Sequence, residues 1–248
     1  MTSPIKWKTT RVGEARVIHW KKHDAKELMK AIDGAPIQEI GKHPVVRVHD
    51  FGKLRLAVRE FDPFAETNVT GKQAFARLNE LARKHAAIVE APVAFVHRGK
   101  QNPLIVTIWK KNHTKLIDYL SREDILDLLK ERACITAAIQ TAKLHATGII
   151  HGHLDPENFV VSDGGHSQLI DCTLLRKFNP KNDEVGLKDF EAKNVFERIS
   201  LARYGDHIAD WKRTQRADLR SRMYGVYLTK KGEILEKMKR NNLHFAEV

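Results

Sequence analysis

Apolar and polar residues follow two different periods in the first part of the chain. Residues 24–33 place apolar side chains at helical spacing, with Asp24 at the N-cap position. Residues 45–48 and 54–61 instead show strand-like runs on either side of a short turn that contains glycine. The pattern therefore predicts a short helix followed by a β-hairpin.

A second helix and two further strands are predicted between residues 70 and 109. Thr70 and Gln73 form a capping-box sequence in front of apolar residues at helical spacing. Residues 93–97 and 104–109 are strand-like and are separated by a loop that contains glycine and proline. With the hairpin, these elements predict a small antiparallel sheet with one helix.

The second half of the chain has a mainly helical pattern. Ser121 and Asp124 form another capping-box sequence and predict a long helix that leads to His151. Helical spacing returns at residues 187–203 and 232–240. An order of sheet first and helices second predicts an α+β protein.

Length and composition limit the possible classes. A chain of 248 residues with 42% hydrophobic residues suits one domain or a two-lobed unit. The two cysteines, Cys134 and Cys172, provide neither a disulfide framework nor a cysteine metal knuckle, which fits a reducing compartment. No apolar run approaches the ~20 residues of a membrane span, and the first residues lack the apolar core of a secretory signal. We expect a cytoplasmic protein without a transmembrane segment.

The formal net charge of +12 predicts attraction to polyanions, and nucleotides, nucleic acids and anionic lipids all satisfy it. Residues 211–240 hold ten Lys or Arg against three acids. At helical spacing this stretch could follow the phosphates of RNA or an anionic membrane surface. A solvated basic face is the simpler alternative.

The most informative motif is the loop from His151 to Asn158, which reads HGHLDPEN, with Asp171 thirteen positions after Asn158. This loop, followed by a short apolar strand, a turn and a second strand, resembles the protein-kinase catalytic loop H-R-D-L-x-x-x-N and the metal-binding D-F-G. The resemblance implies that Asn158 and Asp171 bind Mg²⁺, since their oxygens are hard ligands. An Asn in a turn and an Asp that caps the next element are the structural alternative.

The loop departs from the kinase pattern at the catalytic Asp. His153 occupies that position, and Asp155 follows two residues later. Small atypical kinases and aminoglycoside-phosphotransferase-like enzymes read H-G-D-L-H-P-x-N, so the two residue types are exchanged here. The resemblance implies that Asp155 reaches the acceptor hydroxyl from its later position, or that His153 accepts the proton. The opposing interpretation is a pseudokinase whose loop keeps its fold and has lost its base.

Upstream residues resemble the nucleotide-binding strands of kinases. Residues 37–48 are similar in register to the strand and glycine-rich loop that cover phosphates, of which Gly41 and Val48 are retained. The Leu-Ala-Val-Arg sequence that ends at Arg59 resembles V-A-I-K, with Ala57 retained and Arg59 in place of the phosphate-pairing Lys. A plain hairpin with an outward-facing Arg is the alternative.

Residues 104–109 and 116–120 look like the hinge strand and the helix that follows it. The resemblance implies that backbone groups of Ile108, Trp109 and Lys110 contact adenine. Two acids are expected to support the site. They are Glu80 as the helix partner of Arg59 and Asp189 as the buried acid that braces the catalytic loop, with a surface Asp as the alternative for Asp189.

The short helical half resembles the RIO kinases, the small kinase of the KEOPS tRNA-modification complex and the lipopolysaccharide-core sugar kinases. The resemblance implies a two-lobed protein-kinase-like fold, with an N-terminal extension (1–33), an N-terminal lobe for nucleotide cover and hinge (34–110) and a C-terminal helical lobe (111–248). It also implies a phosphotransferase that binds ATP and Mg²⁺ and transfers the γ-phosphoryl group to a hydroxyl of a protein Ser/Thr or a sugar. The alternatives are a pseudokinase scaffold or nucleotide sensor, and a basic nucleic-acid-associated protein.

Overall fold

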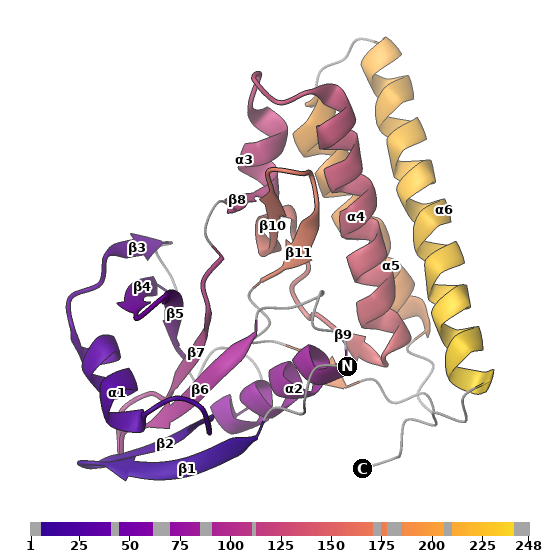
Figure 1. The fold of residues 1–248 in the computed structure, drawn as a ribbon. Coiled ribbons are helices and arrows are strands. Elements are labelled where there is room, and N and C mark those ends of the chain that lie inside the picture. The colour runs from indigo at the N-terminus through magenta and orange to yellow at the C-terminus, as the bar shows by residue number, and fades with distance from the viewer. Residues whose placement is uncertain are drawn as a thin grey trace. The chain divides into compact units, whose positions relative to one another are not determined.

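The computed structural model describes residues 6–40, 45–61, 70–84, 91–110, 113–170, 175–177, 185–205 and 210–240. The described residues form an α+β protein with six α-helices and a seven-stranded antiparallel sheet (Figure 1). The chain divides into two compact units. The sheet unit contains Met1–Lys111 and Cys172–Leu174, and the helical unit contains Asn112–Asp171 and Leu175–Val248.

The sheet unit contains β1 (Trp7–Val12), β2 (Ala15–Trp20), α1 (Ala25–Asp33), β3 (Gln38–Ile40), β4 (Val46–Phe51), β5 (Leu54–Glu60), α2 (Gly71–Lys84), β6 (Pro92–His97) and β7 (Leu104–Ile108). The strand order is β1-β2-β6-β7-β5-β4-β3. The predicted hairpin is present as β4 and β5, with Phe51 opposite Leu54. The sequence pattern did not predict β1 and β2. Because β2 pairs with β6, residues 7–33 belong to this sheet unit and are not an extension outside it.

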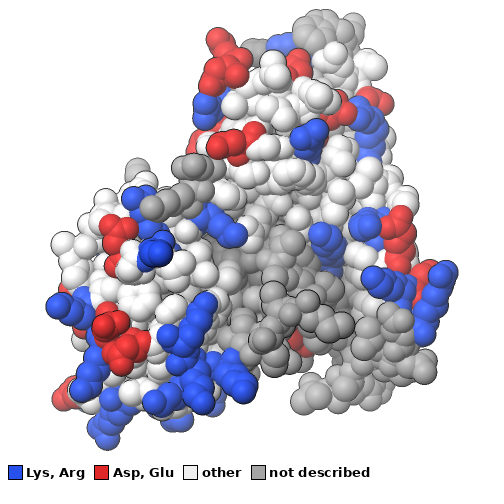
Figure 2. All heavy atoms as spheres, viewed as in Figure 1, with Lys and Arg blue, Asp and Glu red and all other residues white. Residues whose placement is uncertain are grey.

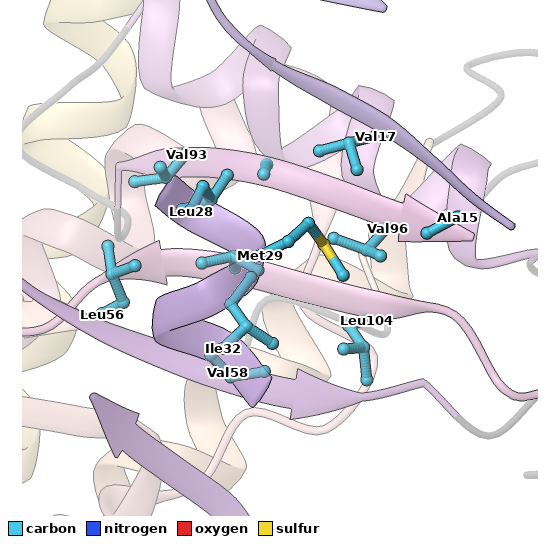
Figure 3. Packing of buried hydrophobic residues seen from close by; sticks show 12 residues of the cluster. Ala15, Val17, Leu28, Met29, Ile32, Leu56, Val58, Val93, Val96 and Leu104 are labelled. Atoms are coloured by element: carbon cyan, nitrogen blue, oxygen red, sulfur yellow. The ribbon is translucent and has the colours of Figure 1, made fainter. Parts of the chain in front are cut away.

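One face of the sheet is covered by α1, which begins where the sequence predicts. Asp24 Oδ1 accepts the N–H groups of Lys26 at 2.8 Å and Glu27 at 3.0 Å. The helix buries Leu28, Met29 and Ile32 against the sheet (Figure 3). Their strand neighbours in this core, which we call the α1 core, include Ala15, Val17, Leu56, Val58, Val93, Ala94, Val96, Leu104 and Val106.

The second helix of this unit, α2, packs against the other face of β6. Its predicted capping box is confirmed, since Gln73 N–H donates to Thr70 Oγ1 at 3.3 Å and Thr70 N–H donates to Gln73 Oε1 at 2.9 Å. Phe75 of α2 contacts Phe95 of β6, with ring centroids 5.7 Å apart. Phe95 lies between Ala94 and Val96 of the α1 core, so it points to the opposite face of the sheet.

The helical unit contains β8 (His113–Lys115), α3 (Leu116–Ser121), α4 (Asp127–Ala146), β9 (Ile149–Ile150), the short 3-10 helix η1 (Pro156–Asn158), β10 (Phe159–Ser162), β11 (Ser167–Leu169), β12 (Arg176–Lys177), α5 (Val185–Tyr204) and α6 (Asp210–Arg240). α6 lies alongside α4 (Figure 1). The side of α4 that is buried carries small residues such as Ala133, Ala137 and Thr141, which allow close packing. No helix in the described ranges is long and apolar enough to cross a membrane.

The predicted start of the long helix α4 was wrong. The helix begins at Asp127, after Leu126, and no side chain caps it. Ser121 instead ends α3, where its hydroxyl donates to the carbonyl of Asp118 at 2.8 Å. Asp124 is bound by the guanidinium of Arg122, with Nε at 2.9 Å from Oδ1. Both capping-box residues are therefore engaged in other local contacts.

Candidate catalytic loop and nucleotide-binding strands

The loop between β9 and β10 is fastened to α5 by one largely buried carboxylate. Glu191 Oε1 accepts the N–H of Gly152 at 2.7 Å, and Oε2 accepts the N–H of His151 at 3.1 Å. The prediction that Asp189 braces the loop was wrong, because Glu191 has this role. Asp189 instead accepts a hydrogen bond from Lys231 of α6 at 3.3 Å. Two consecutive backbone N–H groups of the loop thus donate hydrogen bonds to a single side chain of α5.

A buried chain of hydrogen bonds continues from Glu191 into α4 and α6. His145 Nε2 donates to Glu191 Oε2 at 2.8 Å, and His145 Nδ1 lies 3.0 Å from the hydroxyl of Tyr227. Lys231 Nζ donates to the same hydroxyl at 3.1 Å. Because His145 and Tyr227 are at most 1% exposed, the chain runs through the interior of the helical unit. The loop position therefore depends on three helices.

The charge states along this chain are set by burial. Burial lowers the pKa of His145, although the neighbouring Glu191 carboxylate acts in the other direction, so the imidazole is neutral and Nδ1 accepts the hydroxyl proton of Tyr227. Burial alone would raise the pKa of Glu191, but hydrogen bonds from His145 and the His151 N–H outweigh it and lower that pKa. Burial raises the pKa of Tyr227, so this hydroxyl stays protonated. Glu191 is the one ionised group among the three.

The end of β11 is tied to the same loop on two sides. His151 Nε2 donates to the carbonyl of Ile170 at 3.2 Å, and the N–H of Ile170 donates to the carbonyl of Asn158 at 2.8 Å. Burial lowers the pKa of His151, so the ring is neutral, which suits a structural residue. Asp171, the second predicted metal ligand, lies outside the described residues.

The side chain of Asn158 is held in a defined orientation. Its Nδ2 donates to the carbonyl of His153 at 2.5 Å, which leaves Oδ1 as the hard oxygen that could bind a metal. Asn158 is 9% exposed. In the part of the chain that the structure describes, no group of three or more His, Cys, Asp or Glu is placed to hold a metal ion. A metal site here would need Asn158 together with Asp171.

The two predicted acceptor-handling residues have different surroundings. Asp155 Oδ1 accepts the N–H of Glu157 at 3.1 Å, which caps η1, and Oδ2 is paired with Arg198 of α5. His153 is exposed on the loop. Because Arg198 occupies Oδ2, Asp155 can orient a hydroxyl only if that hydroxyl approaches beside Arg198 or displaces it.

In the sheet unit, the strand register brings together three of the predicted nucleotide-binding residues. Ala57 on β5 lies opposite Val48 on β4 and Thr107 on β7. Arg59 follows Ala57 by two residues and therefore shares its face of the sheet. Val48 and Ala57 are buried and Arg59 is half-buried. Gly41 lies outside the described residues.

The predicted hinge is already partly engaged within the sheet. The N–H of Ile108 donates to the carbonyl of Ala91 at 2.9 Å, and the N–H of Trp109 donates to the carbonyl of Arg55 at 2.8 Å. The side chain of Ile108 packs against the α1 core. These two amides are therefore not available to adenine. The groups that could still contact adenine are the backbone carbonyls of the predicted hinge and the backbone of Lys110, which is exposed.

Much of the basic C-terminal stretch has a structural use. Arg216 and Arg220 of α6 pair with Glu197 of α5, the first at 3.9 Å. Arg222 pairs with Glu131 of α4 and with Asp218, the latter at 3.7 Å. The pairs with Glu197 and Glu131 join α6 to α5 and α4, so the stretch is part of the helical unit's packing.

Sequence reasoning missed Glu191, His145 and Tyr227. Each is an ordinary residue of a helical pattern, and only packing brings the three together. No protein-family model matches the chain. The loop of the helical unit and the strands of the sheet unit are therefore each interpreted from their own residues.

Proposed function

We propose that the chain has a two-lobed kinase-like fold and is an atypical phosphotransferase that binds ATP with Mg²⁺ and transfers the γ-phosphoryl group to a hydroxyl of a protein or a sugar. The observation that carries this proposal is the doubly fastened loop. At its start, the N–H groups of His151 and Gly152 donate hydrogen bonds to Glu191. At its end, Asn158 is hydrogen-bonded to His153 and Ile170. Phosphoryl transfer needs positioning and charge neutralisation more than covalent chemistry, and a loop held at both ends supplies positioning.

Asn158 and Asp171 are the residues that would hold Mg²⁺. The anchored amide of Asn158 fits this role, because its other polar atom, Oδ1, is the type of ligand that Mg²⁺ prefers. Bound Mg²⁺ would neutralise phosphate charge. Arg59 would contact phosphate from the sheet unit, and the face that carries Val48 and Ala57 would contact the base.

In this proposal Asp155 orients the acceptor hydroxyl. Its contacts with the N–H of Glu157 and with the guanidinium of Arg198 fix the position of the carboxylate. The hydroxyl would accept a hydrogen bond from Arg198 and donate one to Asp155. His153 contributes its backbone carbonyl to the loop, so its exposed imidazole is the secondary candidate for proton transfer.

A pseudokinase is the second candidate, and one observation favours it. Both oxygens of Asp155 are already partnered, by a backbone N–H and by Arg198. A carboxylate that only caps η1 and holds α5 would leave the loop folded and without an acceptor group. Nucleotide binding would then serve a scaffold or a sensor.

Turnover of the wild-type chain and its loop variants tests the proposal, with ATP hydrolysis as the readout when no acceptor is known. Asp155→Asn should lower turnover about 10² to 10⁴-fold while nucleotide affinity stays nearly unchanged. His153→Asp should preserve or raise turnover, and His166→Asp in the β10–β11 turn is the matched control. Absence of wild-type turnover, with activity created by His153→Asp, would identify a pseudokinase.

A further inference from the structure

We propose that the sheet unit carries a second ligand site, on the face covered by α1, that binds a small molecule with a phosphate group and hydroxyl groups. The site is a cavity of about 440 Å³, whose polar lining includes Arg47, His49, Glu60, Arg98, Lys100 and Asn102. The proposal is independent of the proposed nucleotide site, because different residues and the other face of the sheet form it.

Strand register places the cavity on that face. Arg47 lies opposite Val58, and Glu60 lies opposite Leu104. Val58 and Leu104 are α1-core residues that lie beside Ile32 of α1 (Figure 3). All three also line the cavity. Arg59 alternates with Val58 and Glu60 and so points to the opposite face. A ligand in this cavity cannot contact Arg59 through the sheet.

The lining of the cavity holds three cationic side chains and one acid, Glu60. Arg98 binds Asp33 through Nη2 at 2.5 Å, while its Nε is buried without a hydrogen-bond partner among the described residues. Arg47 is held by Glu39 at 3.5 Å, and Lys100 makes no ion pair in the described part of the chain. The sheet unit as a whole supplies a favourable field, since residues 1–111 hold 21 Lys or Arg against 11 acids and residues 112–248 hold 22 against 20. Figure 2 shows Lys and Arg gathered over the lower part of this unit.

A tight turn presents two of the cations. The N–H of Gln101 donates to the carbonyl of Arg98 at 2.9 Å, and Gly99 takes a positive φ of 55° within this turn. Arg98 and Lys100 therefore both line the cavity from one short connection between β6 and β7. A guanidinium and an ammonium from one rigid turn suit a phosphate group.

A buried histidine in the lining points to a missing ligand. His49 is 2% exposed, and neither ring nitrogen makes a hydrogen bond of ordinary geometry among the described residues, although the backbone carbonyl of Ala31 interacts with the ring. A buried polar group without a partner is costly and calls for an explanation, of which an absent ligand is one. Burial lowers the pKa of His49, so the neutral ring offers one donor and one acceptor.

The cavity is larger than a phosphate ion needs and falls in the range of small organic ligands. Glu60 accepts a hydrogen bond from Asn102 Nδ2 at 3.1 Å. Its carboxylate would repel a second phosphate but can accept hydrogen bonds from hydroxyl groups. The lining therefore combines cations for one phosphate with amide and carboxylate groups for hydroxyls. This combination matches a sugar phosphate or a polyol phosphate.

Isothermal titration calorimetry with glucose 6-phosphate tests the site, with glucose, inorganic phosphate and citrate as comparison ligands. Lys100→Gln should weaken glucose 6-phosphate binding about tenfold or more, because it removes a charged hydrogen-bond donor. Lys53→Gln in the β4–β5 turn, which removes the same charge from the same unit, should leave the affinity unchanged. His49→Leu should weaken binding while the melting temperature stays equal or rises.

Binding of glucose 6-phosphate that is tighter than binding of glucose or phosphate, and that only Lys100→Gln and His49→Leu weaken, would support the site. Equal weakening by Lys53→Gln would mean general charge attraction and would overturn it. Tighter binding of citrate would overturn the assignment to phosphate. A wild-type chain that binds none of the probes at millimolar concentration would overturn the proposal as a whole.

Discussion

Glu191 accepts the backbone N–H of Gly152 at 2.7 Å, although the two residues lie 39 positions apart. The same carboxylate also holds the N–H of His151 and the imidazole of His145. One acid of α5 therefore sets the position of the loop that carries the candidate chemistry, and its other contacts tie that position to α4 and α6. The first three predictions follow from this arrangement.

Glu191→Gln should loosen the loop without changing the volume of the side chain. The Gln side chain keeps one acceptor oxygen but has an NH₂ group where Glu191 has its second oxygen. At least one of the buried donors that now contact Glu191 therefore loses its acceptor. We expect the free energy of unfolding to fall by about 2 to 3 kcal/mol and amide exchange at His151 and Gly152 to accelerate. Glu197→Gln, which weakens the partly exposed ion pairs with Arg216 and Arg220, is the control and should cost at most about 1 kcal/mol. Equal effects of the two substitutions would contradict the role of Glu191 in holding the loop.

Stability should fall as the pH is lowered from about 7 to about 5. Burial lowers the folded-state pKa of His23, His49, His145 and His151, so the unfolded chain binds more protons in this range. The stabilisation is present at pH values above the histidine pKa of the unfolded chain, about 6.5. Below that pH, the free energy of unfolding falls by up to about 1.4 kcal/mol per pH unit for each histidine. Urea unfolding across this range measures the slope. His145→Gln keeps a donor for Glu191 but does not titrate, so its slope should be smaller, and an unchanged slope would contradict the assignment.

Tyr227→Phe should destabilise the helical unit by removing the hydroxyl that joins α6 to α4. His145 Nδ1 would lose its donor inside the protein, and Lys231 would keep only Asp189, for an expected loss of about 1 to 2 kcal/mol. Tyr224→Phe is the matched control, because its ring stacks on Tyr227 at 5.9 Å and it lies on the same helix. A thermal or urea unfolding curve for each variant gives the comparison. The account fails here if both variants unfold alike.

Arg59→Ala should weaken ATP binding about tenfold to a hundredfold, since it removes a guanidinium from the face that carries Ala57 and Val48. Arg11→Ala, on the exposed edge strand β1, makes the same change of charge elsewhere in the sheet unit. Calorimetric titration with ATP and Mg²⁺ should distinguish the two variants. Similar affinities for both would reduce Arg59 to a structural strand residue.

The elements with strong periodicity could be predicted from the sequence, and those without it could not. The hairpin at residues 46–60 and the capped helices at Asp24 and Thr70 appear where the pattern places them. β1 was missed because its alternation is weak and most of its residues are polar. The start of α4 was misplaced because Ser121 and Asp124 make contacts that compete with capping.

The candidate site was predictable only where a local motif carries it. The order of His151, Asn158 and the following strand could be read from the sequence, whereas the acid that braces the loop could not. Asp189 and Glu191 lie about 200° apart around a helix, and packing alone decides which of them faces the loop. The ion-pair partner of Asp155 could not be predicted either, because Arg198 is distant in sequence and is one of several basic residues on its helix.

Thermal melting with ATP and Mg²⁺, added together and separately, tests the central claim most directly. Ligand that binds the native state raises apparent stability, by about 2.7 kcal/mol at a hundredfold excess over its dissociation constant. We predict a higher melting temperature for the wild-type chain with both ligands than with either alone, and loss of the Mg²⁺-dependent part in Asp171→Ala. An unchanged melting temperature with both ligands at millimolar concentration, or a full shift retained by Asp171→Ala, would contradict the account.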